Sequence, residues 1–174
     1  MKFEKISRDN FIKALKKYQE EENLSDYEVA QSLQYFDNEF KLPTRGTVDS
    51  AGYDFYTPVV AYRKDHVIKI PTGVKVKLDT GTFLMAVPRS SSYKKNYELA
   101  NTIGIIDKDY YNNPSNEGHI YIMLRNLGSQ NNDNREKLSD IGDRLIQGII
   151  LKYSTTEDDT TTKVRTGGYG STGK

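Results

Sequence analysis

The chain has 174 residues, enough for one domain with its own buried core. Its 25 basic and 24 acidic residues leave a net charge of +1, so no overall field would gather nucleic acid or an anionic membrane, and any phosphate must be held by local groups. The absence of cysteine excludes a disulfide scaffold and a thiolate metal site, and it fits a reducing compartment.

The N-terminal segment, residues 1–11, is rich in charge and lacks the apolar core of a signal peptide. No run of about 18 apolar residues, the length of a membrane span, occurs in the sequence. We therefore expect an intracellular, cytoplasmic protein, in the host cell cytoplasm if the source is viral, with neither a membrane nor a nucleic acid as its partner.

The first predicted element covers residues from about 8 to 40. Phe11, Leu15 and Tyr18 recur at helical spacing. The segment from Ser25 to Glu28 is a capping-box pattern, which begins a second helical stretch. The sequence therefore predicts a helical hairpin here.

From residue 41 onward, short apolar or alternating segments are separated by Pro, Gly, Asp and Asn. Such a rhythm is typical of an all-β sandwich or barrel. Residues 112–118 and 128–140 interrupt it with the polar composition of loops. The segments that we expect to be strands are 66–70, 74–78, 82–87, 103–106, 119–124 and 145–153.

Four polar stretches stand out against this background. They are Ala51-Gly52-Tyr53-Asp54, Pro88-Arg89-Ser90-Ser91, the residues from Asn101 to Tyr110, and Arg144-Leu145-Ile146-Gln147. Taken singly, most have an ordinary structural explanation, because an acid after glycine is usual in a turn and an Arg-Ser-Ser sequence is usual in a solvated loop. The third stretch is expected to be a hairpin whose descending strand carries Asp107 and Asp109. Residues two apart on a strand share one face, where like charges repel unless a cation or hydrogen-bond donors lie between them.

The C-terminal segment changes character once more. From Ser154 the chain becomes rich in Thr and Asp and then in Gly, without the periodicity of a core element. The residues from Arg165 to Lys174 combine glycines, hydroxyls and one tyrosine, a composition suited to wrapping phosphates, although a disordered tail without function stays open. We expect a β domain over residues 1–153, with the helical insert at about 8–40, followed by a C-terminal arm, residues 154–174.

The order of these stretches is specific. A-G-Y-D, P-R-S-S, N-x-x-G-I-I-D-x-D-Y, R-x-x-Q and G-G-Y-G-S-T-G closely resemble the five ordered motifs of the homotrimeric dUTPase family, the enzymes that hydrolyse dUTP to dUMP and pyrophosphate. The resemblance covers residues 41–174. It implies a jelly-roll-like β fold, three subunits that share three active sites, and a C-terminal arm that closes a neighbour's site.

The resemblance assigns roles to the phosphate-binding motifs. It implies that Asp54 holds Mg²⁺ through water while the metal grips the triphosphate oxygens, a site for which one carboxylate is sufficient. Arg89, Ser90 and Ser91 match the phosphate-binding second motif. Gln147 belongs to the fourth motif, which helps to position the phosphates and a nearby water.

The third motif is implied to recognise the nucleoside and to activate water. Asn101 and the backbone from Ile103 to Ile106, including Gly104, resemble the hairpin that pairs with the polar edge of uracil. Tyr110 resembles the residue that packs under the deoxyribose and blocks a 2'-hydroxyl. Asp107 matches the acid that deprotonates the water attacking the α-phosphorus.

The fifth motif is implied to form a lid. Tyr169 matches the aromatic residue that stacks on uracil, where Phe is more usual. Arg165 is the expected γ-phosphate contact, with Lys174 as its substitute, although Arg165 lies one residue closer to the lid aromatic than in most members. The residues that wrap the phosphates are then Gly170, Ser171 and Thr172.

The sequence departs from the usual pattern of the family in two places that affect the expected structure. Asn112 stands where the family normally has Gly, so the turn after Tyr110 must be remodelled. The helical segment at about 8–40 is not part of the family core, and we expect a packing elaboration of the trimer surface, with a surface for a protein partner as the open alternative.

Two other functions were compared with dUTP hydrolysis. The chain could serve chiefly as a nucleotide-binding regulatory or protein-interaction module on the same fold, with the insert and residues 128–140 as contact surfaces. A related dCTP deaminase is disfavoured, because that reaction needs a carboxylic acid beside the pyrimidine amino group and residues 101–110 contain no Glu.

Overall fold

The computed structural model describes residues 1–64, 66–127, 136–163 and 165. Within these residues the helices are α1 (Arg8–Glu22), α2 (Asp26–Asn38) and the short 3₁₀ helices η1 (Ser92–Lys95) and η2 (Lys108–Tyr110). The strands are β1 (Lys2–Lys5), β2 (Thr44–Arg45), β3 (Tyr53–Tyr56), β4 (Ala61–Tyr62), β5 (Ile68–Pro71), β6 (Val74–Lys77), β7 (Thr82–Pro88), β8 (Tyr97–Leu99), β9 (Gly104–Ile106), β10 (Tyr121–Asn126), β11 (Lys137–Ser139) and β12 (Arg144–Lys152).

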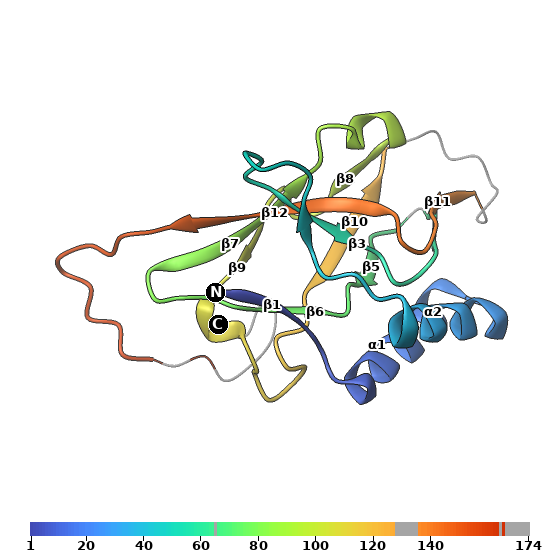
Figure 1. The fold of residues 1–174 in the computed structure, drawn as a ribbon, viewed down its shortest axis with the longest axis horizontal. Helices are drawn as coiled ribbons and strands as arrows, with labels where there is room; N and C mark the ends of the chain where they lie inside the picture. The colour runs from blue at the N-terminus through green and yellow to red at the C-terminus, as the bar shows by residue number, and fades with distance from the viewer. Residues whose placement is uncertain (65, 128–135, 164, 166–174) are drawn as a thin grey trace.

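Antiparallel sheets form the body of the molecule (Figure 1). The largest has the strand order β2-β3-β12-β7-β9, and a second has the order β5-β10-β8. Strand β12 pairs with β3 on one side and with β7 on the other. Leu84 of β7, Leu145 of β12 and Ile122 of β10 are fully buried in one core, which joins the two sheets. The predicted all-β architecture of the domain is therefore confirmed.

The strand predictions hold where the apolar pattern is strong. Each of the six predicted segments overlaps a strand, and these strands are β5, β6, β7, β9, β10 and β12. Strand β11 lies inside residues 128–140, so the prediction of a loop was wrong for this part. It forms because Leu138 and Ser139 are buried and the strand pairs with β4, a tertiary effect that outweighs its polar composition. Residues 112–118 contain turns alone, as predicted.

The predicted helical hairpin is present as α1 and α2, at one end of the β domain in Figure 1. Ser7 caps α1, with its Oγ accepting a hydrogen bond from the Asn10 N–H at 3.4 Å. The capping box predicted at Ser25 and Glu28 begins α2. Neither α-helix in the described part of the chain is long and apolar enough to cross a membrane.

The insert continues the core of the β domain. The ring of Phe11 stacks on that of Phe36 with centroids 3.9 Å apart, and both side chains are buried. The Tyr18 hydroxyl donates to the Val60 carbonyl at 3.1 Å, which ties α1 to the chain entering β4. Because these side chains belong to the same cluster as the sheet residues, burial of apolar surface fixes the insert in place.

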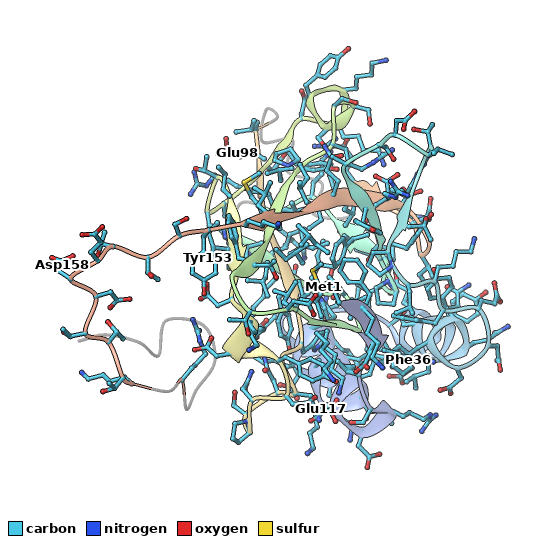
Figure 2. All side chains as sticks on the ribbon, turned by 60° about the vertical axis from the view of Figure 1, so that its left-hand side comes forward. Met1, Phe36, Glu98, Glu117, Tyr153 and Asp158 are labelled. Atoms are coloured by element: carbon cyan, nitrogen blue, oxygen red, sulfur yellow. The ribbon has the colours of Figure 1, made fainter. Side chains whose placement is uncertain are left out.

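Beyond β12 the chain leaves the body of the molecule. Figure 2 shows the segment from Tyr153 to Asp158 running outward. Residues 154–163 are exposed, so this part of the arm adds nothing to the core.

Candidate active site

Strand β3 places an acid between two cations. Asp54 is in register with Gln147 of β12 and with Thr44 of β2. Its Oδ1 accepts a hydrogen bond from Arg89 Nε at 2.7 Å, and its Oδ2 accepts one from Arg144 Nη1 at 3.1 Å. The Asp54 side chain is 13% exposed, so both charge-assisted bonds are partly shielded from water. Three of the four polar stretches therefore meet at this carboxylate.

The Gln147 side chain reaches back over Gly52. Its Nε2 donates to the Pro88 carbonyl at 3.2 Å. A Cβ added to Gly52 would overlap the Gln147 Oε1 atom. The glycine of A-G-Y-D is therefore required by the close approach of a side chain from β12, and the sequence alone could not identify that partner.

The second motif ends β7 and turns into η1. The Arg89 N–H donates to Ser92 Oγ at 3.1 Å, and Arg89 Nη1 lies 3.4 Å from Ser91 Oγ. Ser90 and Ser91 are exposed, whereas Ser92 is buried. The two predicted hydroxyls are thus accessible to a ligand, and Ser92, which sequence reasoning missed, holds the turn that presents them.

The third motif crosses between sheets, so the predicted hairpin was wrong. Strand β8 pairs with β10, whereas β9 pairs with β7. Between them Thr102 has a φ of 60°, next to Asn101, and its N–H donates to the Leu99 carbonyl at 2.9 Å. A Cβ on Gly104 would lie 3.2 Å from the Cβ of Ala86, its partner in register. In the described residues β9 is the last strand of its sheet, which leaves one row of backbone donors and acceptors for another molecule.

The two acids of this motif follow β9 instead of lying on it. The strand ends at Ile106, Asp107 is the residue directly before η2, and Asp109 lies within η2. The expectation that both acids share one face of a strand was therefore wrong, because the chain turns at Asp107. A cation nevertheless lies between them, since Arg165 Nη2 donates to Asp107 Oδ2 at 2.6 Å and Arg165 Nε donates to Asp109 Oδ1 at 3.0 Å. The Arg165 side chain is 14% exposed and rests on the third motif of its own chain.

Tyr110 is fixed through its hydroxyl group. The hydroxyl donates to the His119 carbonyl at 2.8 Å and accepts a hydrogen bond from Asn116 Nδ2 at 2.8 Å. The Tyr110 side chain is buried, and Arg165 Cζ lies 5.9 Å from its ring centroid. A ring held in this way is a rigid support for a group that binds beside Asp107.

The turn after Tyr110 shows how the departure at residue 112 is accommodated. Asn112 has a φ of 56°, a left-handed conformation that asparagine adopts more readily than most residues other than glycine. Asn113 Oδ1 accepts hydrogen bonds from the N–H groups of Ser115 and Asn116 at 3.0 and 3.2 Å. Sequence reasoning missed Asn113 and Asn116, whose side chains hold the remodelled loop.

The contacts above form two charged clusters, which lie apart within one chain. The Asp54 cluster contains Asp54, Arg89, Arg144 and Gln147, and the Asp107 cluster contains Asp107, Asp109 and Arg165. Asp54 is in register with Gln147, which pairs with Val87 of β7, whereas Ile106 pairs with Leu84 of the same strand. Three positions along β7 correspond to about 10 Å at roughly 3.3 Å per residue. The remaining predicted contacts lie outside the described residues, namely Tyr169, Gly170, Ser171, Thr172 and Lys174.

Asp54 is the one carboxylate, among the described residues, at the point where the first, second and fourth motifs meet. Both oxygens of Asp54 are bonded to guanidinium groups, and no cluster of three or more acids or histidines suited to a metal ion occurs among the described residues. Mg²⁺ keeps several waters and binds one or two carboxylates together with substrate phosphates. This donor set fits Mg²⁺ that arrives with a triphosphate.

Known proteins resemble this chain in sequence and in fold. A sequence model of the dUTPase family matches residues 38–173. The deoxyuridine 5'-triphosphate nucleotidohydrolase of Lactococcus lactis is 39% identical over 136 residues, which cover 76% of this chain and 87% of the relative. The crystal structure of dUTPase from Streptococcus mutans matches with a TM-score of 0.62 at 36% identity, covering 69% of this chain and 91% of that chain. A mutant dUTPase from phage phi11 of S. aureus, described with a structural Mg(II) ion, supports the fold at 21% identity and a TM-score of 0.55, covering 72% of this chain and 92% of that chain.

The matched region contains the residues of both charged clusters. It begins at residue 38, so α1 and nearly all of α2 lie outside it. The extent of the match and the identity to the bacterial relatives lead to one conclusion: the chain belongs to the dUTPase family.

Proposed function

We propose that the chain is a dUTP diphosphatase whose active sites are assembled from more than one subunit of a homotrimer. It hydrolyses dUTP to dUMP and pyrophosphate, the activity for which its relatives are named. The observation that supports a shared site is that the Asp54 and Asp107 clusters are both formed in one chain yet lie apart on it. A regulatory module that only binds nucleotide is not favoured, because the acid that the reaction needs is retained.

Asp107 is the residue that we assign to water activation. Its side chain is 48% exposed, so a water molecule can reach the carboxylate. The attacking water forms a new P–O bond at the α-phosphorus and gives its proton to Asp107. The bond from the α-phosphorus to the bridging oxygen breaks, and pyrophosphate leaves with the electron pair. General-base assistance of this kind contributes about 10² to 10⁴ in rate.

The Asp54 cluster is assigned to the triphosphate. Arg89 and Arg144 already hold one carboxylate and have the fork geometry that also suits phosphate oxygens. The exposed hydroxyls of Ser90 and Ser91 add donors, and Gln147 is held at the same place by Pro88. When bound, Mg²⁺ would neutralise charge on the phosphates, with Asp54 as its protein partner through water.

The edge of β9 is assigned to the base. Backbone groups from Gly104 to Ile106, together with Asn101, pair with the polar edge of uracil. Cytosine presents a donor where uracil presents an acceptor, and a mismatched buried group costs on the order of 1 to 3 kcal/mol. Tyr110, fixed through its hydroxyl, lies under the deoxyribose and leaves no room for a 2'-hydroxyl.

The arm supplies the remaining contacts. Tyr169 stacks on uracil, and Arg165 exchanges its contacts with Asp107 and Asp109 for the γ-phosphate, with Lys174 as its substitute. The residues that wrap the phosphates are Gly170, Ser171 and Thr172. We further propose that the protein works in the cytoplasm and that the insert provides a surface for a protein partner.

A nucleotide panel tests the activity. Pyrophosphate release is measured with dUTP, dCTP, dTTP and UTP in the presence of Mg²⁺, and dUTP alone is expected to react. Asp107→Asn keeps the shape of the side chain and should lower kcat by about 10² to 10⁴ while dUTP binding is retained. Full turnover by Asp107→Asn would reject the assignment of the base.

Subunit mixing tests the shared site. Arg89→Ala and Asp107→Asn chains are prepared separately, then unfolded and refolded together. If Arg89 and Asp107 come from different subunits, some sites in mixed trimers contain both native residues and activity returns in part. If one chain supplies both residues, every site lacks one of them and no activity returns. Refolding with wild-type chains controls for exchange, and a mass measurement in solution establishes the number of subunits.

A further inference from the structure

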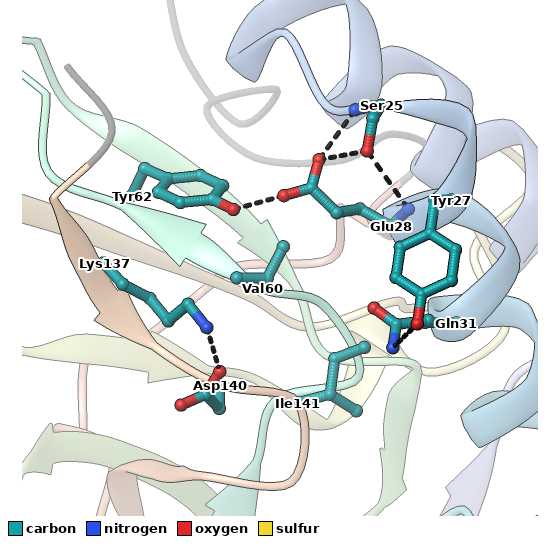
Figure 3. A pocket seen from close by; sticks show the side chains of 9 residues that line it. All are labelled: Ser25, Tyr27, Glu28, Gln31, Val60, Tyr62, Lys137, Asp140 and Ile141. Carbon is teal, nitrogen blue, oxygen red and sulfur yellow. Dashed lines mark hydrogen bonds and ion pairs between the residues drawn. The ribbon is translucent and has the colours of Figure 1, made fainter.

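The helical insert forms a pocket that dUTP hydrolysis does not use. The first turns of α2 meet β4 and the chain around β11, and together they line a cavity of about 420 Å³ (Figure 3). This is within the usual size of ligand pockets, roughly 300 to 1,000 Å³. Figure 1 places α2 and β11 at the opposite end of the β domain from the edge formed by β7 and β9.

The charge of the lining favours a cation. Glu28 and Asp140 are acids, and Lys137 is the single base among the lining residues. Lys137 Nζ donates to Asp140 Oδ1 at 2.7 Å, so this ammonium already has a carboxylate partner. Asp140, with smaller contributions from Tyr62 and Glu28, raises the pKa of Lys137 above its ordinary value. Helix α2 carries no Lys or Arg, and its other acids, Asp26 and Asp37, lie outside the lining, with Asp37 paired to Arg8.

The start of α2 offers little to an anion. Ser25 Oγ accepts a hydrogen bond from the Glu28 N–H at 3.3 Å. Glu28 Oε2 accepts hydrogen bonds from the N–H and the hydroxyl of Ser25, each at 2.7 Å. These reciprocal bonds occupy donors that an anion would need and place a carboxylate at the helix start.

Rings and aliphatic groups shape the pocket for a cation on an apolar stem. Figure 3 shows Tyr27 and Tyr62 on two sides of the pocket, with Val60 and Ile141 between them. Tyr27 is 71% exposed, and the Tyr62 hydroxyl donates to Glu28. The face of a tyrosine ring attracts an ammonium or guanidinium group within about 6 Å of its centroid. The methylene stems of lysine and arginine pack against apolar surface while the charged head stays at polar groups.

We propose that this pocket binds the side chain of an arginine or lysine presented by a partner protein. The lining provides carboxylates and ring faces for the charged head and aliphatic contacts for the stem. The inference does not depend on dUTP hydrolysis, and it gives the proposed partner surface of the insert a defined chemistry.

The test uses the full chain and three probes. They are a short peptide with one arginine and blocked ends, the same peptide with citrulline, and free spermidine. Binding is followed by NMR through the ring signals of Tyr27 and Tyr62. The arginine peptide should bind at least about tenfold more tightly than the citrulline peptide, which keeps the shape without the charge. Equal binding of the two peptides, binding of spermidine alone, or no shift with any probe would overturn the proposal.

Two surface substitutions should change the affinity for the arginine peptide in opposite directions. Tyr27→Ala removes a ring face and should weaken the arginine peptide about two- to fivefold. Lys137→Ala removes the ammonium that competes for Asp140 and should strengthen binding. Tyr93→Ala is the matched control, because Tyr93 lies on η1 and is 72% exposed, against 71% for Tyr27. Weaker binding by Lys137→Ala, or equal effects of Tyr27→Ala and Tyr93→Ala, would contradict the proposal.

Discussion

Gly52 shows how a single residue controls the geometry of the proposed phosphate site. Its missing Cβ leaves space for Gln147, which is held at the Pro88 carbonyl. In Gly52→Ala the Gln147 side chain must swing away, and the misplacement of a positioning group should lower kcat by about tenfold to a hundredfold. The melting temperature should change little, because the displaced amide can turn toward solvent. Steady-state kinetics and thermal unfolding of the same preparation measure both effects.

Gly46→Ala is the matched control for this substitution. A Cβ at Gly46 would meet nothing within 4 Å, and the residue lies outside both clusters. Its kinetics should equal those of the wild type. Undiminished turnover in Gly52→Ala would show that the position of Gln147 does not matter for the reaction.

The sequence predicted which residues would share a site more readily than it predicted their contacts. Asp54, Arg89 and Gln147 were proposed from their motifs, and the structure brings them together where β3, β12 and the end of β7 meet. Ser92 and Asn116 were missed, because each matters only through a partner that the fold supplies, the Arg89 backbone for the first and the Tyr110 hydroxyl for the second. A buried hydroxyl or amide has no sequence signal until its neighbours are known.

At the scale of elements, the insert is part of the folded core. Phe11 of α1 is fully buried against Phe36 of α2. Phe11→Ala should therefore lower the free energy of unfolding by about 3 to 5 kcal/mol, the usual cost of removing a buried aromatic ring. Urea unfolding measures this loss. Tyr27→Ala on the exposed face of the same hairpin should stay within about 0.5 kcal/mol of the wild type, and an equally small loss for Phe11→Ala would show that the insert is not packed as described.

Helices and strands with a strong periodic pattern were predictable from sequence. Short strands that form only because a distant strand pairs with them were not. Helices α1 and α2 carry their own capping residues and apolar spacing, so local sequence defines them. Strand β11 has three residues, and β8 also has three, too few to show a period. Their hydrogen bonds come from β4 and β10, which are distant in sequence. The turn at Asp107 was missed for the same reason, because η2 is a single short turn after β9.

At the scale of the whole molecule, the arm and the body have separate tasks. Residues 154–163 are exposed, and Arg165 joins the arm to Asp107 and Asp109. Removal of residues 165–174 should therefore lower kcat/KM for dUTP at least about tenfold, because one charge-assisted contact to the substrate is worth more than 1 kcal/mol. The melting temperature should change little, since none of the core residues in the described part of the chain is removed. Unchanged turnover in the truncated protein would remove the arm from the mechanism.

Acid should weaken the whole fold through His119. This side chain is 1% exposed, and its Nε2 accepts a hydrogen bond from the Gly73 N–H at 2.9 Å, which requires a neutral ring. Burial, with a smaller contribution from Lys69, lowers the pKa of His119 from 6.5 to about 3. Above about pH 6.5 the ring is neutral in both the folded and the unfolded chain, and the contribution of His119 to the free energy of unfolding is fully present. At lower pH the ring is protonated in the unfolded chain but stays neutral in the folded chain, so the free energy of unfolding falls.

This linkage predicts how the stability difference between the wild type and a His119 variant changes with pH, and urea unfolding measures it. Between about pH 5.5 and about pH 4.5, the stability advantage of the wild type over His119→Gln should shrink by about 1.4 kcal/mol, since glutamine has no proton to gain. The comparison with the variant cancels the other titrating groups, which are common to both proteins. A difference that stays constant over this range would mean that His119 is charged in the folded protein and that the bond to Gly73 is absent.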